Sequence, residues 1–219
     1  MADRITVTLD GPAGVGKTTL ARNVAKKLGI AYMDTGAMFR SIGWKLGKEA
    51  EKLTPAEIEQ RLTAFEFSLS GAGAKTILYL NGTPVGDEIR TEEVALMASA
   101  VATLPVVRTF LKANQQKLAA QVSLIAEGRD MGTVVFPEAR YKFFLDATPE
   151  ERARRRYDQL IAAGETPDMK ELTEQIRKRD HQDRSRVVAP LRPADDAIII
   201  DTTDLDIEGV FAAIISNIQ

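Results

Sequence analysis

The stretch RITVTLDGPAGVGKTTLARNVAKKLG spans residues 4–29. Its first part, residues 4–9, alternates β-branched and apolar side chains, which predicts a buried strand. Apolar side chains then recur at every fourth position over residues 20–28, which predicts a helix that ends at the following glycine. The connection between them, residues 11–18, fits the pattern G-x-x-x-x-G-K-[ST]. A strand, this loop and a helix in that order predict a phosphate-binding loop, or P-loop.

The P-loop motif carries its own chemistry. Its glycines allow successive N–H groups to point at phosphate oxygens, and the helix that follows presents its positive end there. Lys17 is expected to reach the β- and γ-phosphate oxygens of a nucleoside triphosphate, and the Thr18 hydroxyl is expected to bind Mg²⁺. Asp10 either touches a Mg²⁺-bound water or the transferred phosphate, or is an ordinary turn residue at a strand end. The residues expected to bind the triphosphate are Gly11, Pro12, Ala13, Gly14, Val15, Gly16, Lys17, Thr18 and Thr19.

The composition excludes several classes of protein. The chain has 219 residues, 44% apolar and 27% charged, with a net charge of −2, which is typical of a soluble globular protein. Its length fits one α/β domain with inserts or one large and one small domain, and we expect a single domain over residues 1–219. The absence of cysteine and the single histidine, His181, exclude disulfides and a thiolate- or histidine-based metal site. The near-neutral charge argues against nucleic-acid binding. Because no apolar run is long enough for a membrane span or a signal segment, we expect a cytoplasmic protein.

Four more short apolar runs predict strands, each with a helical pattern beside it. They cover residues 30–33, 122–126, 141–145 and 197–200. Strands that alternate with helices in this way form parallel sheets whose faces are covered by the helices. Together with residues 4–9, they predict an α/β fold with a five-stranded parallel sheet flanked by helices. Residues 34–36 are predicted to form a turn after the second strand.

A different pattern occupies residues 65–90. Two short alternating runs, residues 65–69 and 76–80, are separated by glycines and followed by Asn81-Gly82, which predicts a small antiparallel β insert. Such an insert in an α/β sheet is either a substrate-facing element or a surface hairpin.

The sequence predicts where two helices begin. Thr54 and Thr148 are each followed by proline and, three residues after the threonine, by glutamate at positions 57 and 151. This is the sequence of a capping box, in which the hydroxyl and the carboxylate each accept a hydrogen bond from the backbone at the helix start.

Arginine is concentrated in one segment of the chain. Residues 150–186 contain 10 basic and 9 acidic side chains, and 8 of the 17 arginines. Such a segment is either a solvated, salt-bridged helical face or an anion-binding surface. Arg179, Asp183 and Arg186 fall on one face of a helix, and that face could bind a phosphate or a ribose.

Charged residues also follow two of the predicted strands, where parallel sheets bind ligands. Arg40, about one helical turn beyond residues 34–36, either directs its guanidinium at a phosphate or is a surface arginine. Arg129 and Asp130 follow the strand predicted over residues 122–126, and they are either functional or a local ion pair.

These motifs together resemble the cytidylate kinase family, one of the nucleoside monophosphate kinases. The resemblance extends over nearly the whole chain and rests on DTGAMFR (34–40), VGDEIRTEEV (85–94), GRDMGTVVFPEA (128–139), FLDATPEERARRR (144–156), RDHQDRSR (179–186) and APLRPADDA (189–197). The P-loop is generic, whereas GRDMGTVVFP and the β insert separate this family from adenylate, guanylate and thymidylate kinases.

The resemblance implies a P-loop kinase that transfers the γ-phosphoryl group of ATP to CMP or dCMP by direct in-line displacement, with Mg²⁺ as cofactor. It implies a monophosphate-binding insert over residues 60–100 and a helical lid over residues 150–165. It further implies a monomer that binds small-molecule substrates, with no nucleic acid and no membrane. The alternative is another P-loop kinase with a different nucleotide or a small metabolite as acceptor. A nucleotide-dependent switch or a nucleic-acid-handling ATPase is disfavoured by the net charge of −2.

The resemblance also implies roles for individual residues. Lys17 and the lid arginines Arg155 and Arg156 would be catalytic, with Arg152 in the same lid. The residues implied for the substrate are Thr35 and Arg40, Ser99 and Arg108, Arg129 and Asp130, and Arg179, Asp183 and Arg186. Of these, Arg40, Arg129 and Arg179 would bind the phosphate, Asp183 with Arg179 and Arg186 the ribose, and Ser99, Arg108 and Asp130 the cytosine. Cytosine has an amino donor beside two ring acceptors, which a carboxylate, a hydroxyl and an arginine fit.

Overall fold

The computed structural model describes residues 4–218. Its strands are β1 (Thr6–Asp10), β2 (Ala31–Asp34), β3 (Phe67–Ser70), β4 (Ile77–Leu80), β5 (Thr83–Pro84), β6 (Leu124–Gly128), β7 (Tyr141–Asp146) and β8 (Ile198–Asp201). Its α-helices are α1 (Lys17–Leu28), α2 (Thr35–Leu46), α3 (Pro55–Leu62), α4 (Glu92–Val101), α5 (Pro105–Ala119), α6 (Pro149–Ala162), α7 (Met169–Ser185) and α8 (Ile207–Ile215). Short 3₁₀ segments cover Lys48–Lys52, Gly73–Lys75 and Asp87–Arg90, and a π-helical turn covers Met131–Val135.

A five-stranded parallel sheet in the order β2-β6-β1-β7-β8 confirms the predicted fold class. The five strands lie where the apolar runs predicted them, and their ends differ from the prediction by at most two residues. Strands β6 and β7 are buried along almost their whole length. This explains why their sequences are mainly apolar rather than alternating, with Glu127 and Lys142 as buried charged exceptions.

The chain forms two compact units. The insert-bearing unit comprises residues 4–6 and 25–127, and the P-loop unit comprises residues 7–24 and 128–218. Within residues 4–218, no single helix has the length and apolar content of a membrane span, although α4 and α5, bent by 99°, pass that test as a pair.

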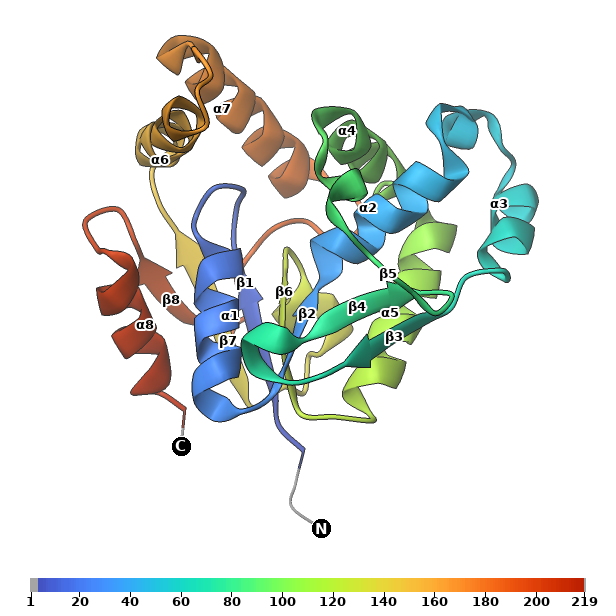
Figure 1. Cartoon of the computed structure of the whole chain (residues 1–219), viewed down its shortest axis with the longest axis horizontal. Helices are drawn as coiled ribbons and strands as arrows, with labels where there is room; N and C mark the ends of the chain where they lie inside the picture. The colour runs from blue at the N-terminus through green and yellow to red at the C-terminus, as the bar shows by residue number, and fades with distance from the viewer. Residues whose placement is uncertain (1–3, 219) are drawn as a thin grey trace. The chain divides into compact units, whose positions relative to one another are not determined.

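The predicted antiparallel insert is confirmed in the insert-bearing unit, where β3, β4 and β5 form a three-stranded sheet (Figure 1). Asn81 and Gly82 connect β4 to β5 with φ angles of 51° and 73°. Positive φ at both central residues is the geometry of the two-residue turns that match the twist of a hairpin. The two-residue strand β5 was not predicted, because its only paired positions are Thr83 and Pro84.

The predicted turn over residues 34–36 is wrong, because α2 begins immediately after β2. The Asp34 carboxylate accepts a hydrogen bond from the Ala37 N–H at 2.8 Å and thereby caps the helix. An aspartate that satisfies this otherwise unpaired donor allows a helix to begin without an intervening turn.

The two predicted capping boxes have different outcomes. Thr54 forms the complete box: its hydroxyl accepts from the Glu57 N–H, and the Glu57 carboxylate accepts from the Thr54 N–H at 2.8 Å. The Thr148 hydroxyl also accepts from the Glu151 N–H, at 3.3 Å. The Glu151 carboxylate, however, binds the guanidinium groups of Arg154 and Arg155. Charge-assisted pairs of this kind are stronger than one bond to a backbone N–H, which accounts for the difference.

Candidate active site

The P-loop, Gly11–Thr18, connects β1 to α1 in a conformation that requires glycine. The φ angles of Gly11, Gly14 and Gly16 are 149°, 79° and 89°, which side chains of L-residues rarely allow. At Gly11 the space is closed as well, since a Cβ there would lie 2.2 Å from the Leu145 carbonyl oxygen of β7. The local backbone therefore explains the first and last glycines of the motif and adds Gly14 to them.

Lys17 is the first residue of α1, and its side chain is buried. Its ammonium group donates to the carbonyl oxygens of Gly11, at 2.8 Å, and Pro12, at 2.6 Å. The loop therefore holds a buried positive charge against its own backbone. An ammonium in this position is a donor of the kind that P-loop enzymes direct at the β- and γ-phosphates.

Thr18 and Thr19 are exposed in the first turn of α1. Mg²⁺ in nucleotide sites takes few protein ligands and completes its shell with phosphate oxygens and waters. The Thr18 hydroxyl is such an oxygen donor, so the residues present fit the ion. Within residues 4–218, no group of three or more His, Asp and Glu side chains could hold a metal ion.

Asp10 is a buried carboxylate at the end of β1. Its Oδ1 accepts from the Met131 N–H at 2.9 Å and its Oδ2 accepts from the Gly132 N–H at 2.8 Å. Burial raises the pKa of Asp10 to about 6, and the charge of Asp130 acts in the same direction, while the two backbone bonds and Lys17 oppose the rise. Asp10 therefore ties the strand before the P-loop to the turn that follows Asp130, a role beyond that of an ordinary turn residue.

We expect the unfolding free energy of the wild type to fall relative to that of Asp10→Asn as the pH rises. In the unfolded chain the Asp10 carboxyl ionises near its ordinary pKa of 3.8, whereas in the folded chain it keeps its proton until the pH reaches about 6. The stabilising effect of this proton is therefore lost as the pH rises between these two values. Because the slope is about 1.4 kcal/mol per pH unit, urea denaturation at about pH 5 and about pH 7.5 should reveal a relative loss of about 1 kcal/mol. A stability difference between the two proteins that is independent of pH would contradict this.

Asp183 of α7 brings two of the predicted substrate arginines together. Its buried carboxylate accepts from Arg129 Nε at 2.9 Å and from Arg186 Nη2. Burial would raise the pKa of Asp183, but the charges of Arg129 and Arg186 outweigh it and hold the pKa below its usual value. Arg179, exposed one turn earlier on α7, contributes to the same lowering. Of the predicted helical face, only Arg179 and Asp183 lie on α7; Arg186 follows its last residue, Ser185, and reaches Asp183 from outside the helix.

Asp130 is buried at the start of the π-helical turn Met131–Val135. Its carbonyl oxygen accepts from the N–H groups of Val134, at 2.9 Å, and Val135, at 3.2 Å. The backbone at this position is therefore held by the turn that follows.

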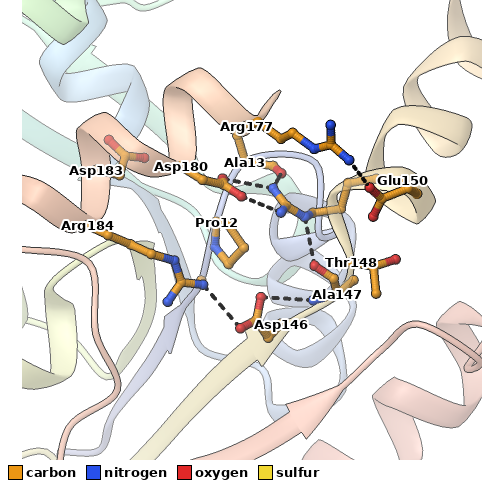
Figure 2. Close-up of polar contacts among 12 residues, drawn as sticks. Pro12, Ala13, Asp146, Ala147, Thr148, Glu150, Arg177, Asp180, Asp183 and Arg184 are labelled. Carbon is orange, nitrogen blue, oxygen red and sulfur yellow. Dashed lines mark hydrogen bonds and ion pairs between the residues drawn. The ribbon is translucent and has the colours of Figure 1, made fainter. Parts of the chain in front are cut away.

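Arg152 differs from the lid arginines with which the resemblance groups it. Its side chain is 1% exposed. Nε donates to the Ala147 carbonyl at 3.0 Å, Nη1 donates to the Ala13 carbonyl at 3.1 Å, and both Nη atoms bind the Asp180 carboxylate of α7. Figure 2 labels these three partners, Ala13, Ala147 and Asp180. Arg152 is therefore a buried, paired charge in this structure rather than an exposed lid side chain.

The two predicted lid arginines lie in the middle of α6. Arg155 donates to the Glu151 carboxylate at 2.9 Å and to the Thr202 hydroxyl at 3.1 Å, whereas Arg156 is exposed. Helices α6 and α7 pack against each other (Figure 1), and Arg177 of α7 pairs with Glu150 at the start of α6. The segment therefore contains exposed salt bridges, as the first interpretation predicts, while anion binding stays a prediction.

In the insert-bearing unit, two arginines share the Asp34 carboxylate. Arg40 Nη2 lies 3.5 Å and Arg90 Nη2 lies 3.7 Å from Asp34 Oδ2. The Nε atom of Arg40 is buried and has no hydrogen-bond partner among the described residues, which leaves capacity for an anion. Arg90 was not predicted as a site residue, although it lies in the motif VGDEIRTEEV; its proximity to Asp34 is visible only in the structure.

Thr35 has a structural contact. Its buried hydroxyl donates to the Glu127 carbonyl oxygen of β6 at 2.6 Å, and the Glu127 carboxylate accepts from the Tyr32 hydroxyl. The hydroxyl therefore joins the start of α2 to the end of β6, which holds this part of the unit together.

Arg108 and Ser99 come from consecutive helices of the insert-bearing unit. Arg108 of α5 donates from Nη1 to the Ala102 carbonyl at the end of α4, at 3.2 Å, and its guanidinium carbon lies 5.7 Å from the ring centre of Phe39 on α2. Ser99 is partly buried on α4. Helix α4 approaches α2 closely at Gly43, where a Cβ would lie 2.9 Å from the Ala98 nitrogen. This glycine sets the spacing of the helices that carry Arg40 and Ser99.

A parallel sheet of this strand order, a P-loop with a buried lysine, and arginines paired with the carboxylates of α7 define a P-loop kinase. The chain belongs to the cytidylate kinase family, whose model matches residues 7–219. It is 81% identical to a cytidylate kinase of Oleidesulfovibrio alaskensis over all 219 residues of both proteins. It is 62% identical to one of Nitratidesulfovibrio vulgaris over 97% of this chain and 92% of that protein. A solved shikimate kinase of Bacteroides thetaiotaomicron, 15% identical, superimposes with a TM-score of 0.47 over 95% of each chain.

Proposed function

We propose that this chain transfers the γ-phosphoryl group of ATP to CMP or dCMP, giving ADP and CDP or dCDP. The observation that carries the proposal is the 81% identity to a cytidylate kinase over the full length of both chains. An oxygen of the acceptor phosphate attacks the γ-phosphorus in line, and the bond to the bridging oxygen of ADP breaks. No general base is needed, because a phosphate monoester is already ionised at neutral pH. No step requires a second chain, and we propose a monomer that acts in the cytoplasm.

On the donor side, residues 11–19 hold the triphosphate through backbone N–H groups and the positive end of α1. Lys17 exchanges its bonds to the loop carbonyls for bonds to the β- and γ-phosphates, where negative charge is spread in the transition state. Thr18 is the proposed ligand of Mg²⁺, which, when bound, neutralises and orients the phosphate oxygens.

The acceptor-side roles are proposed residue by residue. We assign the CMP phosphate to Arg40, Arg129 and Arg179, the ribose to Asp183 with Arg186, and the cytosine to Ser99, Arg108 and Asp130, with Thr35 beside the acceptor. The phosphate and ribose assignments are supported by the buried Nε of Arg40, which has no hydrogen-bond partner within residues 4–218, and by the cluster of Arg129 and Arg186 around Asp183. Residues 60–100 would then be the monophosphate-binding insert and residues 150–165 the lid.

A single assay tests the proposal against its alternatives. ADP release is measured with ATP and each of CMP, dCMP, UMP, AMP, GMP, dTMP and shikimate as acceptor. We expect CMP and dCMP to have the highest kcat/KM. A higher kcat/KM for another nucleotide or for shikimate would overturn the proposed acceptor while leaving the kinase fold in place.

We expect Arg156→Ala to lower kcat more than it weakens CMP binding. An exposed arginine that reaches the polyphosphate only after lid closure contributes to the transition state and little to the ground state. Arg155→Ala should behave in the same way, because Arg155 has to break its hydrogen bond to the Thr202 hydroxyl before it can reach the polyphosphate. The measurements are steady-state kinetics and CMP titration, with the exposed Arg154→Ala as matched control. A loss of CMP affinity with unchanged kcat would instead assign these arginines to the acceptor.

A further inference from the structure

Arg152 combines burial with an unusually complete set of partners. A guanidinium has five N–H donors in a rigid plane. Those of Arg152 are distributed over the Ala147 carbonyl, the Ala13 carbonyl and both oxygens of Asp180. A buried charge is tolerated when it is paired and its other donors have acceptors; Arg152 is paired with Asp180, and its hydrogen bonds use four of its five N–H groups.

The Arg152 guanidinium contacts the backbone of the P-loop. Its guanidinium binds the Ala13 carbonyl at 3.1 Å. A Cβ placed on Gly14 would lie 3.4 Å from Arg152 Cβ, so the first turn of α6 also packs directly against the loop. Because the peptide between residues 13 and 14 is planar and trans, the bond to the carbonyl directs the Gly14 N–H away from Arg152. The orientation of one phosphate-facing N–H group is thereby set from outside the loop.

On the other side, Arg152 acts on α7 through Asp180 (Figure 2). Asp180 is one helical turn before Asp183, whose carboxylate binds Arg129 and Arg186. A displacement of α7 along its axis would therefore move the arginine cluster as well as Asp180. The exposed pair of Arg177 with Glu150 also joins α7 to α6, but it makes no contact with the P-loop among the described residues.

We propose that Arg152, anchored by Asp180, is a positioning residue that sets both the Ala13–Gly14 peptide of the P-loop and the register of α7. The buried Arg152–Asp180 ion pair then fixes the position of the P-loop relative to the arginines around Asp183. The expected effect on CMP binding rests on the proposed function, whereas the expected effect on ADP binding rests on the P-loop geometry alone.

The test is the conservative variant Arg152→Lys, with Arg177→Lys as matched control. A lysine retains the charge but cannot bind Asp180 with two N–H groups while also reaching Ala13 and Ala147. ADP and CMP are titrated separately by calorimetry, and kcat is measured with ATP and CMP. We expect Arg152→Lys to weaken the binding of both ligands about tenfold and to lower kcat further, as lost hydrogen bonds to charged groups do. Arg177→Lys should keep wild-type affinities and kcat.

Asp180→Asn provides a second route if Arg152→Lys folds poorly. It keeps the shape of the side chain and one acceptor oxygen, and it should weaken ADP and CMP binding in the same proportion. Circular dichroism establishes that each titrated variant is folded. A folded variant of either kind with a lower Tm but wild-type affinity for ADP would overturn the proposal, since it would make the pair merely structural. If the wild type bound ADP but not CMP, the proposed function would fail, while the ADP titrations would still decide the role of Arg152.

Discussion

Lys17→Met is expected to lower kcat by a factor of about 10³ or more while the protein stays folded. The Lys17 ammonium is buried in the P-loop and donates to the carbonyl oxygens of Gly11 and Pro12. In the proposed reaction this charge offsets the negative charge that spreads over the transferring phosphoryl group, and methionine retains the side-chain stem without the charge. The measurement is a coupled assay of ADP release at saturating ATP and CMP, with the thermal transition recorded in parallel.

The matched control for Lys17 is Lys27→Met, which removes an exposed charge from the last turn of the same helix. Its kcat should equal that of the wild type within about twofold, as expected for a surface substitution away from the site. If Lys17→Met also turned over at the wild-type rate, Lys17 would have no part in phosphoryl transfer, and the proposed mechanism would be wrong.

Asp130→Asn is expected to change the choice of base. We assign the Asp130 carboxylate to the amino group of cytosine, and uracil presents an oxygen at the same place. A buried polar group left unpaired costs about 1–3 kcal/mol, and more when it is charged, so the wild type should prefer CMP over UMP by one to several powers of ten in kcat/KM. An asparagine amide can rotate to donate to that oxygen. The variant should therefore lose activity with CMP and have a smaller ratio of CMP to UMP activity.

The control for Asp130 is Glu138→Gln, which neutralises an exposed carboxylate in the same motif. It should leave kcat/KM for both nucleotides unchanged. An equal fall in kcat/KM for CMP and UMP in Asp130→Asn would show that the carboxylate orients the phosphate or an arginine. In that case, the assignment of base recognition to Asp130 would have to be withdrawn.

Local patterns in the sequence were sufficient for the fold class. The alternation over residues 4–9, the P-loop and the repeat over residues 20–28 each express a property of the backbone: strand pleat, positive φ at glycine and helical period. Sequence-local signals failed where two partners competed for one group. Glu151 binds neighbouring arginines instead of completing a capping box, and Asp34 caps a helix where a turn was predicted.

The site residues also divide into those that a local sequence pattern predicts and those whose contacts only the structure reveals. Lys17, within the P-loop, could be assigned from the sequence alone, because a contiguous motif carries its own geometry. The sequence also predicted that Asp183 shares a helical face with Arg179 and Arg186, which is correct for Arg179 and wrong for Arg186, because α7 ends at Ser185. That Arg129 binds the same carboxylate is a long-range contact, which no local pattern contains.

Arg152 and Asp10 illustrate what depended on tertiary structure. In the sequence, Arg152 is one of several arginines in a charged helix, and only its meeting with Asp180 of another helix makes it a buried pair. Asp10 likewise precedes a loop in the sequence, yet its partners are the N–H groups of Met131 and Gly132, more than a hundred residues away. The sequence alone therefore determined the fold class, the P-loop and the family. Tertiary structure decided which charged groups are buried and with which partners, because charge burial depends on what the rest of the chain packs around each group.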